Sequence, residues 1–145
     1  MADRNVTLPV SVRITIEWRY KMIITEQILE LEFEQIHPTV NTYMRWHWTK
    51  RNEEVEIWHW LVKAALKGKK PRFKHPIVRS EYYFTDNRER DTGNYIPKFA
   101  IDALVKEGVL AGDSCKHIKE MMPEIFLKQP EKKFKLIIEE GVVKN

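Results

Sequence analysis

The sequence is poor in the features that mark secreted, membrane-bound or repetitive proteins. Among its 145 residues there is one cysteine, Cys115, so an internal disulfide is impossible and nothing indicates an oxidising compartment. No apolar run approaches the roughly 20 residues that a membrane-spanning helix needs. Residues 1–18 lack the apolar core of a signal peptide, so we expect them to belong to the fold. Internal repeats and low-complexity linkers are also missing. These absences predict a cytoplasmic protein without a membrane partner.

The composition that remains describes one globular domain over residues 1–145. Hydrophobic residues make up 43% of the chain and charged residues 32%, which is typical of a globular rather than a disordered protein. A chain of this length buries about two-thirds of its unfolded surface on folding. The length therefore allows a substantial core without help from disulfides.

One segment concentrates positive charge, although the net charge of the whole chain is only +4. Residues 63–74 contain no acid, whereas acids gather in residues 26–34 and 53–56. The basic side chains of the segment are Lys63, Lys67, Lys69, Lys70, Arg72 and Lys74. A surface polarised in this way suits phosphate binding. A solvated loop at the end of a helix has the same composition, so both interpretations stay open.

Alternating apolar residues predict the strands. Residues 12–20 and 28–33 are apolar at every second position, which is the period of a half-buried strand. A connector around residues 25–27 is short enough for residues 10–20 to pair with 28–33 as an antiparallel hairpin. Their basic and acidic outer rows would then face each other. Residues 78–84 alternate as well, and residues 134–140 form a final strand.

Helical spacing predicts two main helices, over residues 53–67 and 96–107. Asn52 is a candidate cap for the first and Asn94 for the second, and Gly68 and Gly108 follow their ends. The residues expected to face the core are Val55, Trp58, Val62, Ala65, Leu66, Phe99, Ala103 and Leu104.

Residues 37–51 have no clean period and read as a loop in which at least one of Trp46 and Trp48 packs into the core. The order of elements therefore predicts an α/β or α+β domain with a mixed sheet.

The chemistry of the chain is concentrated in residues 87–114, NRERDTGNYIPKFAIDALVKEGVLAGDS. Arg88 and Arg90 lead into Asp91, a turn follows, and Asp113 lies beyond the predicted helix. Two carboxylates at the ends of one helix, with arginines beside the first, fit a metal site that faces a phosphate backbone. Two solvated loops would give the same pattern.

This segment resembles the core of the RusA-type Holliday-junction resolvases. The matching residues are the basic lead-in, Asp91, Asn94, Lys98, the Asp-Ala-Leu run at residues 102–104 and the pair at 113–114. The segment HPTVNTYMR also resembles the Pro-x-x-Asn-x-Tyr element of that family, through Pro38, Asn41 and Tyr43. The resemblance runs in order from Leu29 to about Glu139, which makes residues 1–27 an N-terminal addition. The chain departs from the pattern at Gly93, where the family has its second acid, and by one inserted residue between Asn94 and Lys98.

The resemblance implies a homodimer that cuts four-way DNA junctions in recombination and repair, using Mg²⁺ or Mn²⁺. Asp91 and Asp113 would be catalytic metal ligands, and Lys98 would offset negative charge on the phosphate. The residues expected to hold the DNA are Arg88, Arg90, Lys67, Lys69, Lys70, Arg72, Lys74 and Asn41.

The missing acid at Gly93 leaves three functions open. The first is a metal-dependent junction endonuclease, in which two acids suffice or Asp86, Glu89, Asp102 or Glu107 replaces the third. We expect Asp102 instead to pair with Lys98, one helical turn away. The second is a catalytically impaired relative that binds branched DNA, and the third is a small α/β protein whose acids are ordinary loop residues.

Overall fold

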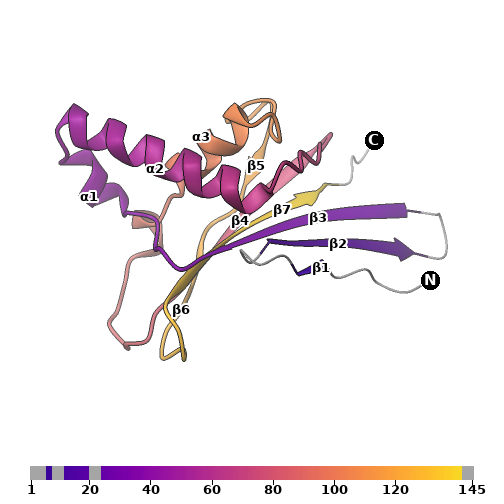
Figure 1. Ribbon diagram of the computed structural model, residues 1–145. Helices are drawn as coiled ribbons and strands as arrows, with labels where there is room; N and C mark the ends of the chain where they lie inside the picture. The colour runs from indigo at the N-terminus through magenta and orange to yellow at the C-terminus, as the bar shows by residue number, and fades with distance from the viewer. Residues whose placement is uncertain (1–5, 8–11, 20–23, 142–145) are drawn as a thin grey trace.

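The computed structural model of the protein describes residues 6–7, 12–19 and 24–141. Three helices, a short 3₁₀ segment and seven strands form this part of the chain (Figure 1). In chain order they are β1 (Val6–Thr7), β2 (Val12–Arg19), β3 (Ile24–Phe33), α1 (Val40–Met44), α2 (Trp48–Leu66), β4 (Pro76–Tyr83), η1 (Thr92–Asn94), α3 (Lys98–Lys106), β5 (Lys119–Glu120), β6 (Glu124–Phe126) and β7 (Lys133–Glu140).

All the described strands belong to one mixed sheet, which confirms the predicted fold class. The strand order is β1-β2-β3-β7-β4-β5, and β6 also pairs with β4. The pairs from β1 to β4 along this order are antiparallel, whereas β5 and β6 run parallel to β4. β5 and β6 run parallel to β4 because the chain leaves the end of β4, passes through α3 and comes back to the start of β4 before it enters them.

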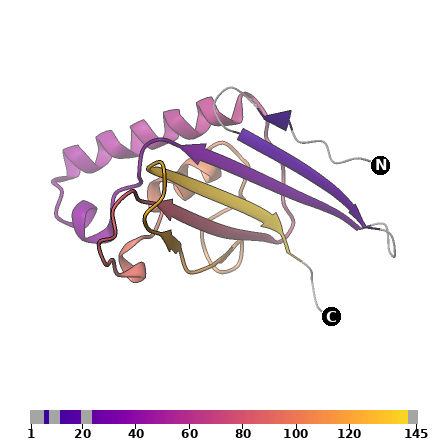
Figure 2. The same cartoon turned by 90° about the horizontal axis from the view of Figure 1, so that it is seen from below.

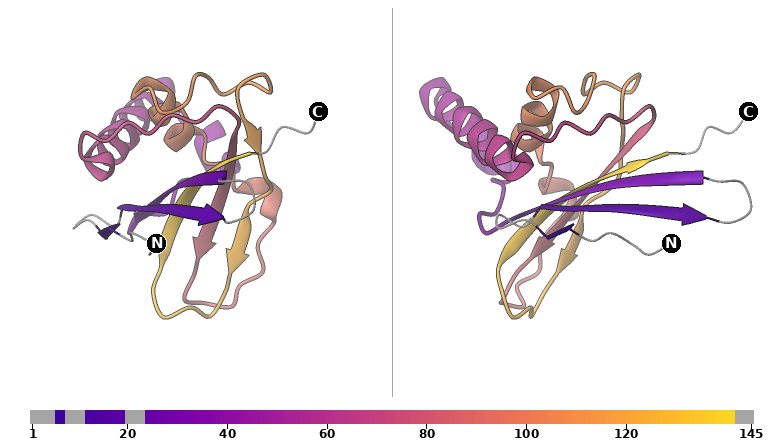
Figure 3. Two further views of the ribbon diagram at one scale, coloured as in Figure 1. Left: turned by 90° about the vertical axis from the view of Figure 1, so that its right-hand side faces the viewer. Right: turned by 45° about the vertical axis from the view of Figure 1, so that its right-hand side comes forward.

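The helices α2 and α3 cover one face of this sheet. In Figure 1 both helices lie above the strands, and Figures 2 and 3 show the far end of the β2–β3 pair extending beyond them. Alternate residues of three central strands are buried beneath the helices: Leu29, Leu31, Phe33, Val78, Tyr82, Phe134, Leu136 and Ile138. The period of two in the sequence arises because only this face meets the helices.

The other face of the sheet carries ion pairs between neighbouring strands. Lys135 Nζ lies 3.6 Å from Glu30 Oε1 and 3.8 Å from Glu32 Oε1, and Lys133 Nζ lies 3.3 Å from the same Glu32 oxygen. The acidic row that the sequence shows on β3 is therefore balanced by β7. On the β2 side, the register sets Arg13 opposite Glu30.

The predicted hairpin of β2 and β3 is confirmed, but the predicted position of its turn, at residues 25–27, is wrong. The strands pair antiparallel from Val12 opposite Leu31 to Arg19 opposite Ile24, so residues 25–27 lie inside β3. Their polar composition indicated a turn, yet a continuous ladder of backbone hydrogen bonds keeps them extended. Residues 10, 11 and 20 of the predicted hairpin lie outside the described residues.

Helix α2 confirms the predicted inner face and corrects the predicted start. Trp58, Val62, Ala65 and Leu66 are buried, and the helix ends where Lys67 (φ 50°) and Gly68 (φ 77°) turn left-handed. It begins at Trp48 rather than beside Asn52. The cap is His47, whose Nδ1 accepts a hydrogen bond from the Thr49 backbone N–H at 3.3 Å.

The segment predicted as a loop, residues 37–51, is therefore largely helical. It contains α1 and the first residues of α2, and it showed no period because α1 is short and Trp48 is 65% exposed. Trp46 packs parallel to Phe99 at 6.4 Å between ring centroids, which confirms that one of the two tryptophans joins the core.

Helix α3 buries the expected Phe99, Ala103 and Leu104 and is followed by Gly108 at φ 79°. Its cap is not Asn94. Pro97 occupies the N-cap position without a side-chain hydrogen bond, and the buried imidazole of His37 accepts the free backbone N–H of Phe99 at 3.0 Å. No helix within the described residues is long and apolar enough to cross a membrane.

Candidate functional site

A pocket of about 180 Å³ lies where α3, the loop after it and β5 meet. Its lining residues are Ile96, Lys98, Ile101, Asp102, Asp113, Ile118 and Glu120. The three carboxylates come from different elements: Asp102 from α3, Asp113 from the loop and Glu120 from β5. We call this site the acidic pocket. It contains two of the residues predicted from the sequence, Asp113 and Lys98.

Burial and the nearby Asp113 disfavour the charged forms of Asp102 and Glu120 in the acidic pocket. Burial raises the pKa of Asp102, and the nearby Asp113 raises it further, against the opposing effect of Lys98. Desolvation where it faces the pocket also raises the pKa of Glu120, again with a contribution from Asp113, although part of this side chain remains in solvent. A bound cation would relieve both effects, because an opposite charge favours the ionised carboxylate.

Lys98 is the cation that the chain itself supplies to this pocket. Its Nζ lies 3.6 Å from Asp102 Oδ2, one turn along α3, which confirms the predicted pair. The lysine side chain is 53% exposed. An exposed pair of this kind is weak, so Lys98 can shift toward a phosphate at little cost.

Asp91 lies in the segment before α3 and does not line the acidic pocket. Its Oδ1 accepts a hydrogen bond from the Gly93 backbone N–H at 3.0 Å and so caps η1. Gly93 itself has no left-handed backbone, and a Cβ added there would meet only Asp91 Oδ1, at 3.5 Å. An aspartate at position 93 therefore fits without backbone strain.

The two segments that carry the family resemblance are neighbours in the fold. The backbone N–H of Asn41, on α1, donates to Asn94 Oδ1 of η1 at 2.8 Å. His37, just before α1, receives the Phe99 N–H of α3, while its Nδ1–H donates to the Pro38 carbonyl at 2.9 Å. These contacts hold η1 and the start of α3 in a fixed position.

The two arginines beside Asp91 differ in their exposure to solvent. The Arg90 side chain is only 7% exposed, pairs with Asp86 at 2.6 Å and lies over the Phe84 ring at 3.7 Å from its centroid. The hydrogen bond from the Arg90 guanidinium lowers the pKa of Asp86 to about 2. Arg88 is exposed. Of the two, Arg88 is the one that a DNA backbone can reach.

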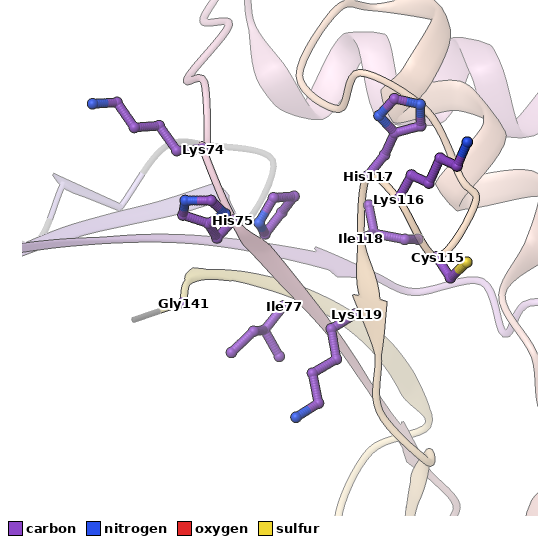
Figure 4. A pocket seen from close by; sticks show the side chains of 10 residues that line it. Lys74, His75, Ile77, Cys115, Lys116, His117, Ile118, Lys119 and Gly141 are labelled. Atoms are coloured by element: carbon purple, nitrogen blue, oxygen red, sulfur yellow. The ribbon is translucent and has the colours of Figure 1, made fainter. Parts of the chain in front are cut away.

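A second pocket, of about 270 Å³, lies beside the acidic pocket and is lined by basic groups. Lys74 and His75 precede β4, Lys116 and His117 lie in the loop before β5, and Lys119 is on β5 (Figure 4). We call it the basic pocket. No acid is among its lining residues, and Ile118 lines both pockets. The other five basic residues of the predicted segment are exposed at the end of α2 and in the loop that follows: Lys63, Lys67, Lys69, Lys70 and Arg72.

Two glycines shape the surroundings of the basic pocket by allowing close approach. A Cβ on Gly112 would collide with the His117 ring at Cδ2, and one on Gly141 would lie 2.8 Å from the His75 carbonyl oxygen. The loop that carries Asp113 is therefore packed tightly against His117.

The donors of the acidic pocket fit a hard divalent cation in part. Carboxylate oxygens are the ligands that Mg²⁺ and Mn²⁺ prefer, and Mg²⁺ often uses only one or two carboxylates while keeping several waters. Within the described residues, however, no three histidine, cysteine or acidic side chains form a group ready to hold a metal. The site thus offers one or two protein ligands rather than a closed cage.

Sequence reasoning missed Glu120, Lys116 and Lys119. They belong to a loop and to a strand of two residues, which are too short to show a period. The run KHIKE, a few residues after Asp113, was the available signal.

No family model and no curated protein matches the chain.

Proposed function

We propose that the protein is a metal-dependent endonuclease that cuts four-way DNA junctions during recombination or repair in the cytoplasm, acting as a homodimer. The observation that carries the proposal is that the acidic and basic pockets share one lining residue, Ile118. Phosphodiester hydrolysis needs a cation site beside a site for the phosphate backbone. The order of motif residues from Asn41 to Asp113 supports the same activity.

In this proposal Asp113, with Asp102 or Glu120, would hold a Mg²⁺ or Mn²⁺ ion, and Asp91 would be the further ligand that the family resemblance implies. A bound ion would supply Lewis-acid polarisation of the phosphodiester. Lys98 lies at the rim and offsets the negative charge that grows on the phosphate.

The exposed lysines near the two pockets hold the DNA without reading its sequence. Lys74, Lys116 and Lys119 contact phosphates on one side, and Lys69, Lys70 and Arg72 extend this surface along the loop after α2. Affinity should therefore fall steeply with salt. Changing Lys116 and Lys119 to Glu should weaken binding about equally for junctions of different sequence.

A second function is favoured by Gly93 and by the position of Asp91. Because the family's second acid is absent and Asp91 does not line the acidic pocket, the same surface can serve a protein that binds junctions without cutting them.

The experiment that separates the two functions uses one synthetic four-way junction in two assays. Cleavage with Mg²⁺, and none with a chelator, supports the endonuclease. A gel shift that favours the junction over a duplex, with no cleavage in Mg²⁺ or Mn²⁺, supports the binding protein. Failure of both assays would contradict both functions.

A further inference from the structure

Helix α2 carries apolar side chains on two faces, and the second face touches the core only through Leu61. The inner face buries Trp58 and Val62. A second set recurs at helical spacing, three and four residues apart: Ile57, Trp60, Leu61 and Ala64. We call this set the outer stripe. Ile57 is 48% exposed and Trp60 68% exposed, and Figure 3 shows α2 at the periphery of the molecule. Packing within one chain does not account for so much apolar surface on one helix.

A groove lies beside the outer stripe. It has a volume of about 480 Å³, and Phe33, Trp60, Leu61 and Ala64 provide its apolar wall. Glu34 and Glu131 lie on its rim together with Lys132. The groove has room for a large aromatic side chain that comes from outside the chain.

On α2, acidic residues lie before Trp60 and basic residues lie after it. Glu53 and Glu56 precede Trp60, and Lys63 and Lys67 follow it; all four are exposed. Within the described residues none of them forms an ion pair with another side chain. Glu53 lies seven residues before Trp60 and Lys67 seven residues after it.

This arrangement is complementary to itself in one orientation only. If two α2 helices pack antiparallel about a two-fold axis at Trp60, Glu53 of each copy lies opposite Lys67 of the other, and Glu56 lies near Lys63. Parallel helices would instead bring like charges together. The antiparallel orientation also sets the helix dipoles against each other favourably.

We propose that the outer stripe is the subunit interface of a homodimer, with α2 of two copies antiparallel and Trp60 of each copy seated in the groove of the other. A two-fold contact of this kind uses the same patch on both subunits. It assigns Lys67 to the subunit contact and leaves Lys69 to Lys74 for DNA. The proposal names the surface of the dimer in the proposed function, and its test does not depend on cleavage.

The test measures molecular mass by light scattering at about 10–100 µM protein, well above the dissociation constants typical of specific interfaces. Sedimentation of a dilution series, extended down to concentrations at which the wild type dissociates, measures the dimer dissociation constant of each variant. The wild type should have twice the 17.4 kDa mass of one chain. Trp60→Glu should raise the dimer dissociation constant about thirtyfold or more, as expected for a central aromatic anchor. Trp48→Glu is the matched control, because Trp48 is 65% exposed on the same helix but points about a third of a turn away. It should leave the mass unchanged.

The charge pattern supplies the second arm of the test. Glu53→Lys should weaken the dimer severalfold, and adding Lys67→Glu should restore it, because the double change exchanges the partners of each pair.

A wild type that is monomeric throughout this range would overturn the proposal. So would a Trp60→Glu variant as dimeric as the wild type, or equal losses from Trp48→Glu and Trp60→Glu. Unchanged mass with lost DNA binding in Trp60→Glu would assign the stripe to base stacking instead.

Discussion

The segment around η1 and the loop that carries Asp113 use their polar side chains in opposite ways. Around η1, Arg90 pairs with Asp86, Asp91 caps the turn, Asn94 accepts the Asn41 N–H and His37 accepts the Phe99 N–H. In the acidic pocket, three carboxylates share a small space with one lysine, and burial and mutual repulsion raise the pKa of Asp102.

The first region stabilises the fold, and the second is where the proposed function requires a ligand to bind. Satisfied hydrogen bonds around η1 fix the fold, whereas the pKa values of Asp102 and Glu120 are raised and a bound cation would lower them. Perturbed acids of this kind are a feature of functional sites.

The largest expected effect tests whether Asp91 belongs to the structural segment or to the site. Asp91→Asn keeps an oxygen that can accept the Gly93 N–H but removes the charge. If Asp91 is a metal ligand, junction cleavage should fall about a thousandfold while DNA binding stays the same or tightens. Rates from single-turnover cleavage measure the effect, and an unchanged rate would assign Asp91 to the turn alone.

The buried imidazole of His37 should make stability depend on pH. Burial lowers its pKa to about 4 from an unfolded value of 6.5. The folded protein therefore binds this proton less readily than the unfolded chain, and about 3 kcal/mol of stability should be lost as pH falls from 6.5 to 4.

Denaturant unfolding across that range measures the loss, and His37→Asn should flatten it. Asp102 and Glu120 act in the opposite sense, because carboxyls with a raised pKa destabilise the fold less as pH falls. The same slope in the wild type and in His37→Asn would show that other groups cause it.

The two arginines offer a matched pair. Arg90→Ala removes a side chain packed on Phe84 and should lower the free energy of unfolding by about 1–2 kcal/mol. Arg88→Ala, at an exposed position, should leave stability unchanged and weaken junction binding. Chemical denaturation and gel shift on both variants check this, and a destabilising Arg88→Ala would contradict the division of roles.

The smallest expected effect concerns the absent acid. Gly93→Asp is sterically permitted and adds a carboxylate close to Asp91. It should raise the cleavage rate and lower the Mg²⁺ concentration needed for half-maximal rate by a few-fold, on the order of what one additional charged ligand contributes at an exposed site. A variant that binds junctions but cuts no faster than the wild type would show that position 93 lies outside the metal site.

The sequence predicted the strands and helices that are long enough to show a regular pattern of buried and exposed residues. Residues 78–84 and 134–140 alternate because one face of each strand meets the helices, and the inner face of α2 shows its spacing because the helix is long. Residues 40–44, 119–120 and 124–126 form elements too short to display a period, so α1, β5 and β6 were missed. The cap of α3 was missed because its partner, His37, is distant in sequence.

For the site, the motif pointed to Asp113 and Lys98, which line one pocket, and the helical spacing of Lys98 and Asp102 predicted their ion pair. Glu120 escaped prediction because its position depends on the parallel pairing of β5 with β4. The burial of Arg90 also escaped it, since its stacking on Phe84 requires the chain to turn back at Asp86.

The proposed endonuclease depends most directly on Asp113, the carboxylate that helps to raise the pKa of both Asp102 and Glu120 in the acidic pocket. The decisive measurement is cleavage of a synthetic four-way junction in Mg²⁺ by the wild type and by Asp113→Asn, at protein concentrations that saturate binding. The account predicts cleavage by the wild type, a loss of at least about a hundredfold in the variant and equal junction binding by both. Equal cleavage by the two proteins, or junction binding by the wild type without any cleavage, would contradict it.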